Sequence, residues 1–176
     1  LVELTEEFAL RYQYDKKDKG LADFNDLEQM AISILLQQDE EGNMVPTEAA
    51  DELAHQFEEI MIDEYQDSNL VQDTLLRSVS RERYGKPNIF MVGDVKQSIY
   101  RFRLARPELF TQKMNEYADA SEQYQRVDLH KNFRSRGLVL DCVNQVFASI
   151  MKRDLGGIEY DDKAALYVGA QFPEED

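Results

Sequence analysis

The stretch EEIMIDEYQD, residues 58–67, places three apolar residues directly before a pair of acids, Asp63 and Glu64. A second stretch, NIFMVGD at residues 88–94, has the same form and ends in Asp94. Neither apolar run alternates with polar residues, a pattern typical of strands buried on both faces of a parallel sheet. The two stretches therefore predict neighbouring parallel strands with acidic side chains at their carboxyl ends.

Helical spacing separates these strands and also follows them. Asp23 and Thr47 are expected to cap two helices, and a third short strand, RVDL, is expected from Arg126. Further helices are expected over residues 1–15, 69–84, 107–118 and 138–151. The loop DEEGNMVP and the chain after Arg153 are expected to lack regular structure. The alternation of strands and helices predicts an α/β fold.

The charge distribution excludes a surface that coats DNA without selectivity. The 176 residues carry a net charge of −15, and nucleic-acid coats are basic. Residues 96–136 differ, because they hold nine Lys and Arg against five Asp and Glu. This segment indicates either a local anion site or a chance scatter of charge, and composition alone does not separate the two.

Several features favour the reducing interior of a cell. Cys142 is the single cysteine, so no internal disulfide can form. The first fifteen residues mix charges and do not resemble a signal peptide. No apolar run is long enough to cross a membrane, and His55 and His130 lack neighbours at zinc-ligand spacing. We expect a cytoplasmic protein without a membrane span or a zinc site.

The acids at the strand ends predict a metal and phosphate site. In open parallel sheets, ligands bind just beyond the carboxyl ends of the strands. Adjacent strands would place Asp63, Glu64 and Asp94 along one edge, where carboxylates can hold Mg²⁺ with water and phosphates completing its shell. A second carboxylate can orient or deprotonate an attacking water. The alternative is a polar turn without a ligand.

Two later stretches add groups that suit nucleic acid or nucleotide. GDVKQSIYRFRLARPELF sets Tyr100 and Phe102 among arginines, a pattern that suits stacked bases with phosphates alongside. KNFRSR sets Phe133 beside Arg134, and an arginine can clamp a phosphate while an aromatic ring stacks on a base. The alternatives are core aromatics in the first stretch and a solvated basic turn in the second.

These stretches together resemble superfamily 1 helicases of the UvrD/RecB kind. MIDEYQDSN resembles their motif II, the Walker B element, VGDVKQSIYRFRLA their motif III and LHKNFRSR their motif IV. ADFNDLEQMA is similar to the element that precedes motif II. Two stretches resemble the AddA branch of helicase–nuclease subunits. They are RFRLARPELF and the C-terminal stretch GGIEYDDKAALYVGAQFPE. The resemblance covers essentially the whole chain and implies an ATP-driven DNA motor with a RecA-like parallel sheet.

The resemblance implies roles for the residues of motif II and motif III. Asp63 would coordinate the Mg²⁺ of MgATP, and Glu64 would position and activate the hydrolytic water. Gln66 and Asp67 would belong to the coupling network of motif II. Gln97 would sense the γ-phosphate.

The resemblance also implies DNA contacts and contacts from a second motor lobe. Tyr100 and Phe102 would face single-stranded DNA, and Arg103 falls at the motif III arginine. Phe133 would stack on adenine, and Arg134 would contact the γ-phosphate. Two positions depart from the usual pattern. Ser68 stands where Thr is more usual and keeps the hydroxyl, and Leu104 replaces a Gly of the UvrD pattern, which fits the AddA branch.

The phosphate-binding element of such motors is absent from the sequence. No G-x-x-x-x-G-K-[ST] occurs, and the nearest stretch, SRERYGKP, lacks the first glycine and the hydroxyl residue. We therefore expect a central piece of a larger protein. Residues 1–125 would be the C-terminal half of the first RecA-like lobe and residues 126–176 the start of the second. Alone, the chain is expected neither to hydrolyse ATP nor to unwind DNA.

Three functions remain open on the sequence. The leading one is an AddA-like helicase with an exonuclease domain elsewhere, which would act on single- and double-stranded DNA with an AddB-like partner subunit. A UvrD-type repair helicase without a nuclease is the second. A motor-derived DNA-binding or assembly module without ATPase activity is the third, and the intact DEYQD stretch, Gln97 and Arg134 count against it.

Overall fold

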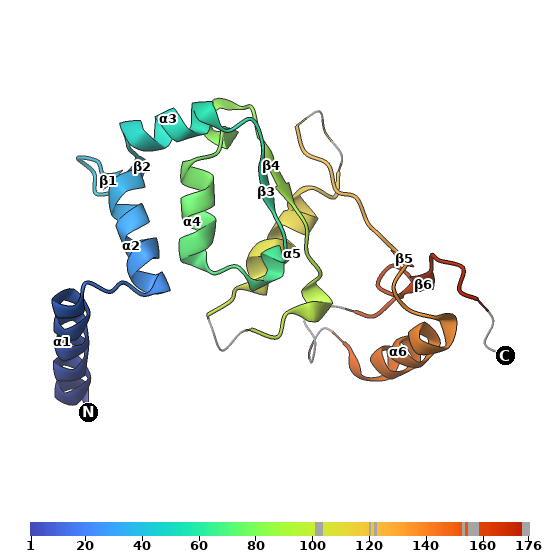
Figure 1. Ribbon diagram of the computed structural model, residues 1–176. Helices are drawn as coiled ribbons and strands as arrows, with labels where there is room; N and C mark the ends of the chain where they lie inside the picture. Colours follow the sequence, from blue (N-terminus) through green and yellow to red (C-terminus); the bar gives the residue numbers. More distant parts are fainter. Residues whose placement is uncertain (101–103, 120, 122, 153, 155–158, 174–176) are drawn as a thin grey trace. The chain divides into compact units, whose positions relative to one another are not determined.

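The computed structural model describes residues 1–176 except 101–103, 120, 122, 153, 155–158 and 174–176. Two of the expected DNA-binding residues, Phe102 and Arg103, lie outside the described residues. The chain divides into two compact units, which are described separately below (Figure 1). The first unit comprises Leu1–Asp63 and Ser68–Met91, and the second comprises Glu64–Asp67 and Val92–Asp176.

Helices and short strands alternate in both units, so the α/β class is confirmed. The first unit contains α1 (Val2–Lys19), α2 (Phe24–Leu35), β1 (Leu36–Gln38), β2 (Met44–Pro46), α3 (Glu48–Gln56), β3 (Ile60–Ile62), α4 (Leu70–Ser78), the 3₁₀ turn η2 (Glu82–Tyr84) and β4 (Ile89–Met91). The second contains η1 (Tyr65–Asp67), η3 (Val95–Gln97), α5 (Pro107–Glu116), β5 (Lys131–Asn132), α6 (Gly137–Ile150) and β6 (Tyr167–Val168). No helix in the described ranges is both long and apolar enough to span a membrane.

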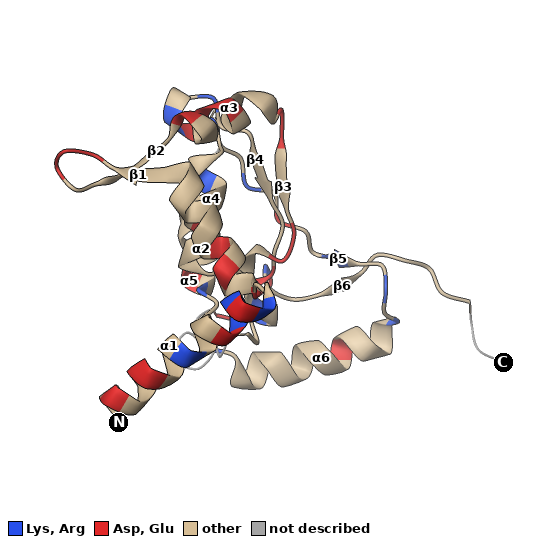
Figure 2. Ribbon diagram, turned by 60° about the vertical axis from the view of Figure 1, so that its left-hand side comes forward, with Lys and Arg blue, Asp and Glu red and all other residues tan. Residues whose placement is uncertain are grey.

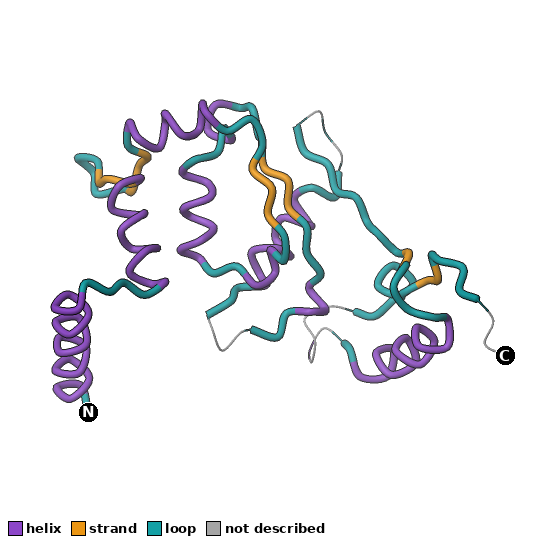
Figure 3. The backbone as a smooth tube through the Cα atoms, viewed as in Figure 1, coloured by secondary structure: helices purple, strands orange, loops and turns teal. Residues whose placement is uncertain are grey.

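The predicted parallel pair of strands is confirmed. β3 lies parallel to β4 (Figure 3). Ile60 stands opposite Ile89 in the register. The prediction that both faces are buried is wrong, because Met61 and Phe90 are paired in the register and are 71% and 61% exposed. Side chains alternate between the two faces of a strand, so only one face of this pair is covered.

Both predicted helix caps are confirmed. Asp23 and Asp26 form a capping box at the start of α2, in which each side chain accepts the other residue's backbone N–H at 2.9 Å. The Thr47 hydroxyl accepts the backbone N–H of Ala50 at 3.4 Å and begins α3. The first helix runs beyond its expected end to Gly20, whose left-handed backbone (φ 63°) closes it.

Three local predictions are wrong. β1 and β2 form an antiparallel hairpin around an acidic turn at residues 39–41, where a loop was expected (Figure 2). β6 forms in the chain after Arg153, where no element was expected. The strand expected from Arg126 forms only at Lys131–Asn132. In the register of this pair, RVDL would face residues 162–165, which form a turn and a bend and not a strand.

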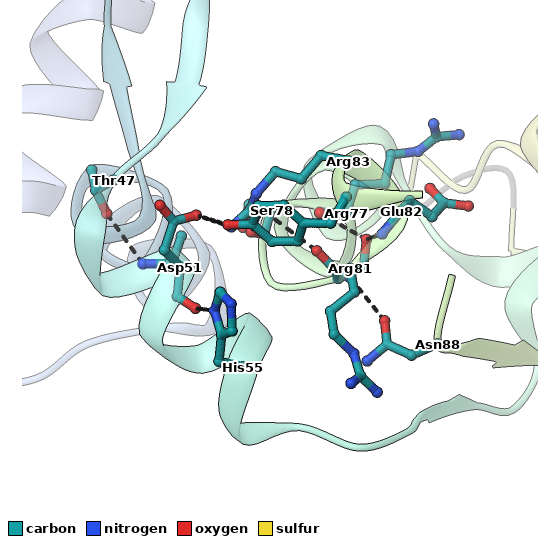
Figure 4. Close-up of polar contacts among 12 residues, drawn as sticks. Thr47, Asp51, His55, Arg77, Ser78, Arg81, Glu82, Arg83 and Asn88 are labelled. Carbon is teal, nitrogen blue, oxygen red and sulfur yellow. Dashed lines mark hydrogen bonds and ion pairs between the residues drawn. The ribbon is translucent and has the colours of Figure 1, made fainter. Parts of the chain in front are cut away.

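A polar cluster in the first unit holds the chain before β4. Asp51 on α3 accepts the Tyr84 hydroxyl at 2.6 Å and forms an ion pair with Arg83 (Figure 4). Asn88 accepts the backbone N–H of Arg81 at 2.8 Å and donates to a backbone carbonyl just before β3 at 3.1 Å. These contacts join α3 and η2 to the entry of both strands, which supports the register of the β3–β4 pair.

An ion pair joins α1 to the start of α2. Lys16 Nζ lies 2.9 Å from Asp23 Oδ2 and 2.6 Å from Asp26 Oδ2. The Lys16 ammonium, with help from the backbone N–H of Asp26, lowers the pKa of Asp23 from 3.8 to about 2. A carboxyl whose pKa is lower in the folded state stabilises the fold above its unfolded pKa. This contribution is therefore lost as the pH falls from about 4 through 2.

We expect Asp23→Asn to flatten the acid dependence of stability. Asparagine keeps the helix cap but removes the charge that Lys16 holds. The measurement is the urea midpoint of unfolding at several values between about pH 5 and 2. The wild-type midpoint should fall more steeply than that of the variant, and Asp15→Asn, an exposed charge on α1, is the matched control. Parallel curves for wild type and Asp23→Asn would contradict the assignment.

Candidate functional site

Glu64 and Gln66 lie in the turn that follows β3. Glu64 adopts a positive φ of 51°, which is uncommon for a residue other than glycine and is concentrated at functional sites. Its carboxylate Oε2 accepts a hydrogen bond from Gln66 Nε2 at 2.7 Å. The Glu64 residue is exposed, whereas Gln66 is only 1% exposed. A buried amide therefore orients an exposed carboxylate.

Gln66 also binds the segment that follows β4. Its Oε1 accepts the backbone N–H of Asp94 at 3.0 Å. A Cβ at Gly93 would lie 2.6 Å from this oxygen and 3.0 Å from the ring of Phe110. That ring packs edge-on against Tyr65, with 5.9 Å between centroids. The missing side chain at Gly93 thus lets the amide reach the backbone.

Asp94 extends the connection to Gln97. Its Oδ2 accepts from Gln97 Nε2 at 3.1 Å, and its Oδ1 accepts the backbone N–H of Lys96 at 3.0 Å. Lys96 Nζ also lies 2.9 Å from Oδ1. Both carboxylate oxygens of Asp94 thus accept hydrogen bonds, and Asp94 caps η3. Glu64, Gln66, Asp94 and Gln97 are called the strand-end network below.

Asp67 is a partly buried acid beside this network. Burial, followed by the negative charge of Glu64, raises the pKa of Asp67 above its usual value. Its Oδ2 lies 3.4 Å from Gln66 Nε2, and its Oδ1 is buried and has no hydrogen-bond partner among the residues that the structure describes. A buried oxygen of this kind is a place where an additional donor group is favourable.

Asp63 and Tyr100 are placed where a ligand could reach them. Asp63 directly follows β3, and both residues are exposed. Asp63 belongs to the first unit, whereas Tyr100 and the strand-end network belong to the second.

Phe133 and Arg134 occupy a turn after β5. Asn132 Oδ1 accepts the backbone N–H groups of Arg134 at 2.9 Å and Ser135 at 2.8 Å. Both predicted side chains are exposed, Phe133 by 67%. Asn132 was not among the predicted residues, although an asparagine at the start of such a turn is a recognised signal.

Comparison with known proteins identifies the family. Residues 2–118 match the UvrD/REP helicase N-terminal domain. The chain belongs to the UvrD/REP helicase family.

Curated relatives extend the similarity to the whole chain. Three of them are named as A-type subunits of an ATP-dependent helicase/nuclease, from Lachnoclostridium phytofermentans (55% identity over 174 residues), Clostridium acetobutylicum (52% over 175) and Bacillus pumilus (51% over 176). Each alignment covers 99% of this chain. The chain spans 13–14% of the length of these relatives.

Proposed function

We propose that this chain is the part of an ATP-dependent DNA helicase/nuclease subunit that positions MgATP for hydrolysis and couples hydrolysis to movement along DNA. The processes served are double-strand break repair and recombination. The observation that carries the proposal is the strand-end network, in which the buried Gln66 amide joins Glu64 to the segment of Gln97. The family match and the name of the relatives support it.

The proposed arrangement is a RecA-like motor in two lobes. Residues 1–125 form the C-terminal half of the first lobe and carry motifs II and III. Residues 126–176 begin the second lobe and carry motif IV. The sequence lacks G-x-x-x-x-G-K-[ST], so the chain alone is inactive and the phosphate cradle comes from elsewhere in the full-length subunit. "Full-length subunit" here means a polypeptide of the relatives' length that carries this chain.

Asp63 fits a Mg²⁺ ion that arrives with the nucleotide. Its carboxylate is exposed just beyond β3, and Mg²⁺ accepts one or two carboxylates while water and phosphate oxygens complete its shell. The described residues contain no group of three or more His, Cys, Asp and Glu that could hold a metal by itself. Water and phosphate would therefore supply the other ligands. When bound, Mg²⁺ neutralises charge on the phosphate oxygens.

Glu64 is the proposed base for the attacking water. Gln66 Nε2 holds the carboxylate on one oxygen, at 2.7 Å, and so fixes its direction. A carboxylate in a fixed direction can orient the water and accept its proton during attack on the γ-phosphate. Asp67, with its buried oxygen and raised pKa, lies next to the same amide and completes the motif II coupling network.

Gln97 and Tyr100 link the nucleotide to DNA in this proposal. Gln97 senses the γ-phosphate, and its amide Nε2 donates a hydrogen bond to Asp94 Oδ2 at 3.1 Å. Tyr100 follows three residues later and contacts single-stranded DNA together with Phe102 and Arg103. Because Tyr100 lies only three positions after Gln97, a movement of Gln97 on loss of the γ-phosphate can be passed along the backbone to the residues that contact the DNA bases.

Phe133 and Arg134 act from the second lobe. The exposed Phe133 ring stacks on adenine, and Arg134 contacts the γ-phosphate as its charge develops in the transition state. An AddB-like partner subunit, single- and double-stranded DNA substrates and a cytoplasmic location belong to the same proposal. A UvrD-type helicase without a nuclease would use the same residues, and a nuclease domain in the full-length subunit separates the two.

We expect Tyr100→Ala to uncouple ATP hydrolysis from DNA. In the full-length subunit, the DNA concentration that gives half-maximal stimulation of ATP hydrolysis should rise about 5- to 100-fold, the range for losing one base–aromatic stack. The rate without DNA should stay the same. Tyr14→Ala, which removes an exposed tyrosine from α1, is the matched control. Equal stimulation of Tyr100→Ala and wild type would remove Tyr100 from the DNA contact.

A further inference from the structure

Gly169 lies against the face of the Phe133 ring. A Cβ built on Gly169 would be 2.9 Å from both Cε1 and Cζ of Phe133 and 3.0 Å from Cδ1. These are three consecutive atoms of the ring. Points equally distant from three consecutive atoms of a regular hexagon lie on the axis through its centre, perpendicular to its plane. The Cβ would therefore meet the ring face near its centre, and Gly169 backs that face.

Glycine is present at position 169 because of space and not because of backbone conformation. Gly20, Gly42 and Gly85 adopt positive φ angles, whereas Gly169 does not. The position is set by the β5–β6 pairing, since the backbone N–H of Gly169 donates to the carbonyl of Asn132 at 2.8 Å. Any residue could adopt this backbone, but a side chain would strike the ring.

The other face of the Phe133 ring is open. The side chain is 67% exposed although one face rests on Gly169. Asn132 fixes the turn that carries the ring, through its bonds to the two backbone N–H groups beyond it. A ring supported on one face and accessible on the other is suited to a planar aromatic ligand, which would bury the exposed face.

We propose that Gly169 is a positioning residue, which sets the height and tilt of Phe133 so that its free face receives the planar base of the nucleotide. This inference rests on the proposed function, in which Phe133 stacks on adenine. Gly169 directly follows β6 and lies outside motifs II to IV. The inference therefore adds a residue from another part of the chain to those that determine base recognition. We expect the effect of Gly169 to be specific to the base, because the three nearest atoms that a Cβ on Gly169 would meet all belong to the Phe133 ring.

The test compares ligands with and without a base. In the full-length subunit, Gly169→Ala should weaken ATP binding about three- to tenfold, part of the loss expected for removing a base–aromatic stack. Binding of inorganic tripolyphosphate should not change. The dissociation constants can be measured by calorimetry at fixed Mg²⁺. Gly137→Ala is the matched control, because its Cβ would meet Val168 at 3.4 Å, an ordinary contact, and would not meet Phe133.

Phe133→Ala separates the failure of the inference from the failure of the proposed function. If Phe133→Ala leaves the preference for ATP over tripolyphosphate unchanged, Phe133 does not stack on the base. That result overturns both the proposed role of Phe133 and the role of Gly169. If Phe133→Ala removes the preference but Gly169→Ala does not reduce it, only the role of Gly169 is overturned. Equal weakening of both ligands by Gly169→Ala also overturns it, since that result marks a general structural fault.

The double variant covers the case in which Gly169→Ala does not fold. Phe133→Ala with Gly169→Ala removes the clashing ring and should fold as Phe133→Ala does. Its ligand preference should equal that of Phe133→Ala, because Gly169 acts only through the ring. A double variant that remains unfolded would show that position 169 matters for another reason and would overturn the proposal.

Discussion

Glu64→Gln is expected to slow ATP hydrolysis by about 10²- to 10⁴-fold in the full-length subunit, which is the usual contribution of a general base. Glutamine keeps the shape of the side chain, and its carbonyl oxygen can still accept the hydrogen bond from Gln66 Nε2. The change therefore removes the proton acceptor and leaves the turn in place. ATP affinity should stay within about twofold, because the lost interaction belongs to the transition state.

The control for this substitution is Glu59→Gln. Glu59 is an exposed acid just before β3, so the same change is made at the opposite end of the strand. Its turnover should match wild type. A second readout comes from Asp67, whose pKa is raised in part by the Glu64 charge and should fall in Glu64→Gln. Turnover that survives Glu64→Gln would remove Glu64 from the role of base.

Gly93→Ala is expected to have the second-largest effect. The added methyl group would lie 2.6 Å from Gln66 Oε1 and 3.0 Å from the Phe110 ring. Overpacking a filled site costs about 1–3 kcal/mol of stability. If the Gln66 side chain moves to avoid the methyl group, its amide loses the hydrogen bond from the Asp94 N–H. The same movement would change the direction of the Glu64 carboxylate, which Gln66 Nε2 holds. We expect turnover to fall about 10- to 100-fold. A less well oriented Glu64 raises the activation free energy, and each increase of about 1.4 kcal/mol slows the reaction tenfold.

Two comparisons separate the clash from a general effect of alanine. Gly137→Ala adds the same methyl group at the start of α6, where its neighbour at 3.4 Å allows it, and should be neutral. Gly93→Ala combined with Gln66→Ala removes the 2.6 Å clash and leaves only the looser contact with the Phe110 ring, so stability should recover in part while turnover stays low. Recovery of turnover in the double variant would show that Gln66 does not orient Glu64.

Features that depend on a few neighbouring residues could be predicted from the sequence. The caps at Asp23 and Thr47 each need one side chain and a backbone N–H three residues later. The parallel strands before Asp63 and Asp94 were also evident, because a short apolar run followed by acids is a local pattern. In these places the local preference and the final structure agree.

Features that depend on distant partners could not be predicted. The strand expected from Arg126 forms only at Lys131–Asn132, because its pairing partner β6 has two residues. No local pattern in the sequence shows where a partner strand ends. Gln66 and Asp94 are 28 positions apart, so their hydrogen bond and the need for glycine at Gly93 emerge only in the fold. The contact of Gly169 with Phe133 is of the same kind.

The most direct measurement of the central claim is ATP hydrolysis by two proteins side by side, with Mg²⁺ and with or without single-stranded DNA. One is the 176-residue chain alone, and the other is the full-length subunit carrying it. We expect no hydrolysis above background from the chain and DNA-stimulated hydrolysis from the subunit, which Glu64→Gln should slow there by about 10²- to 10⁴-fold. Robust DNA-stimulated hydrolysis by the chain alone, or a full-length subunit that does not hydrolyse ATP, would contradict the account.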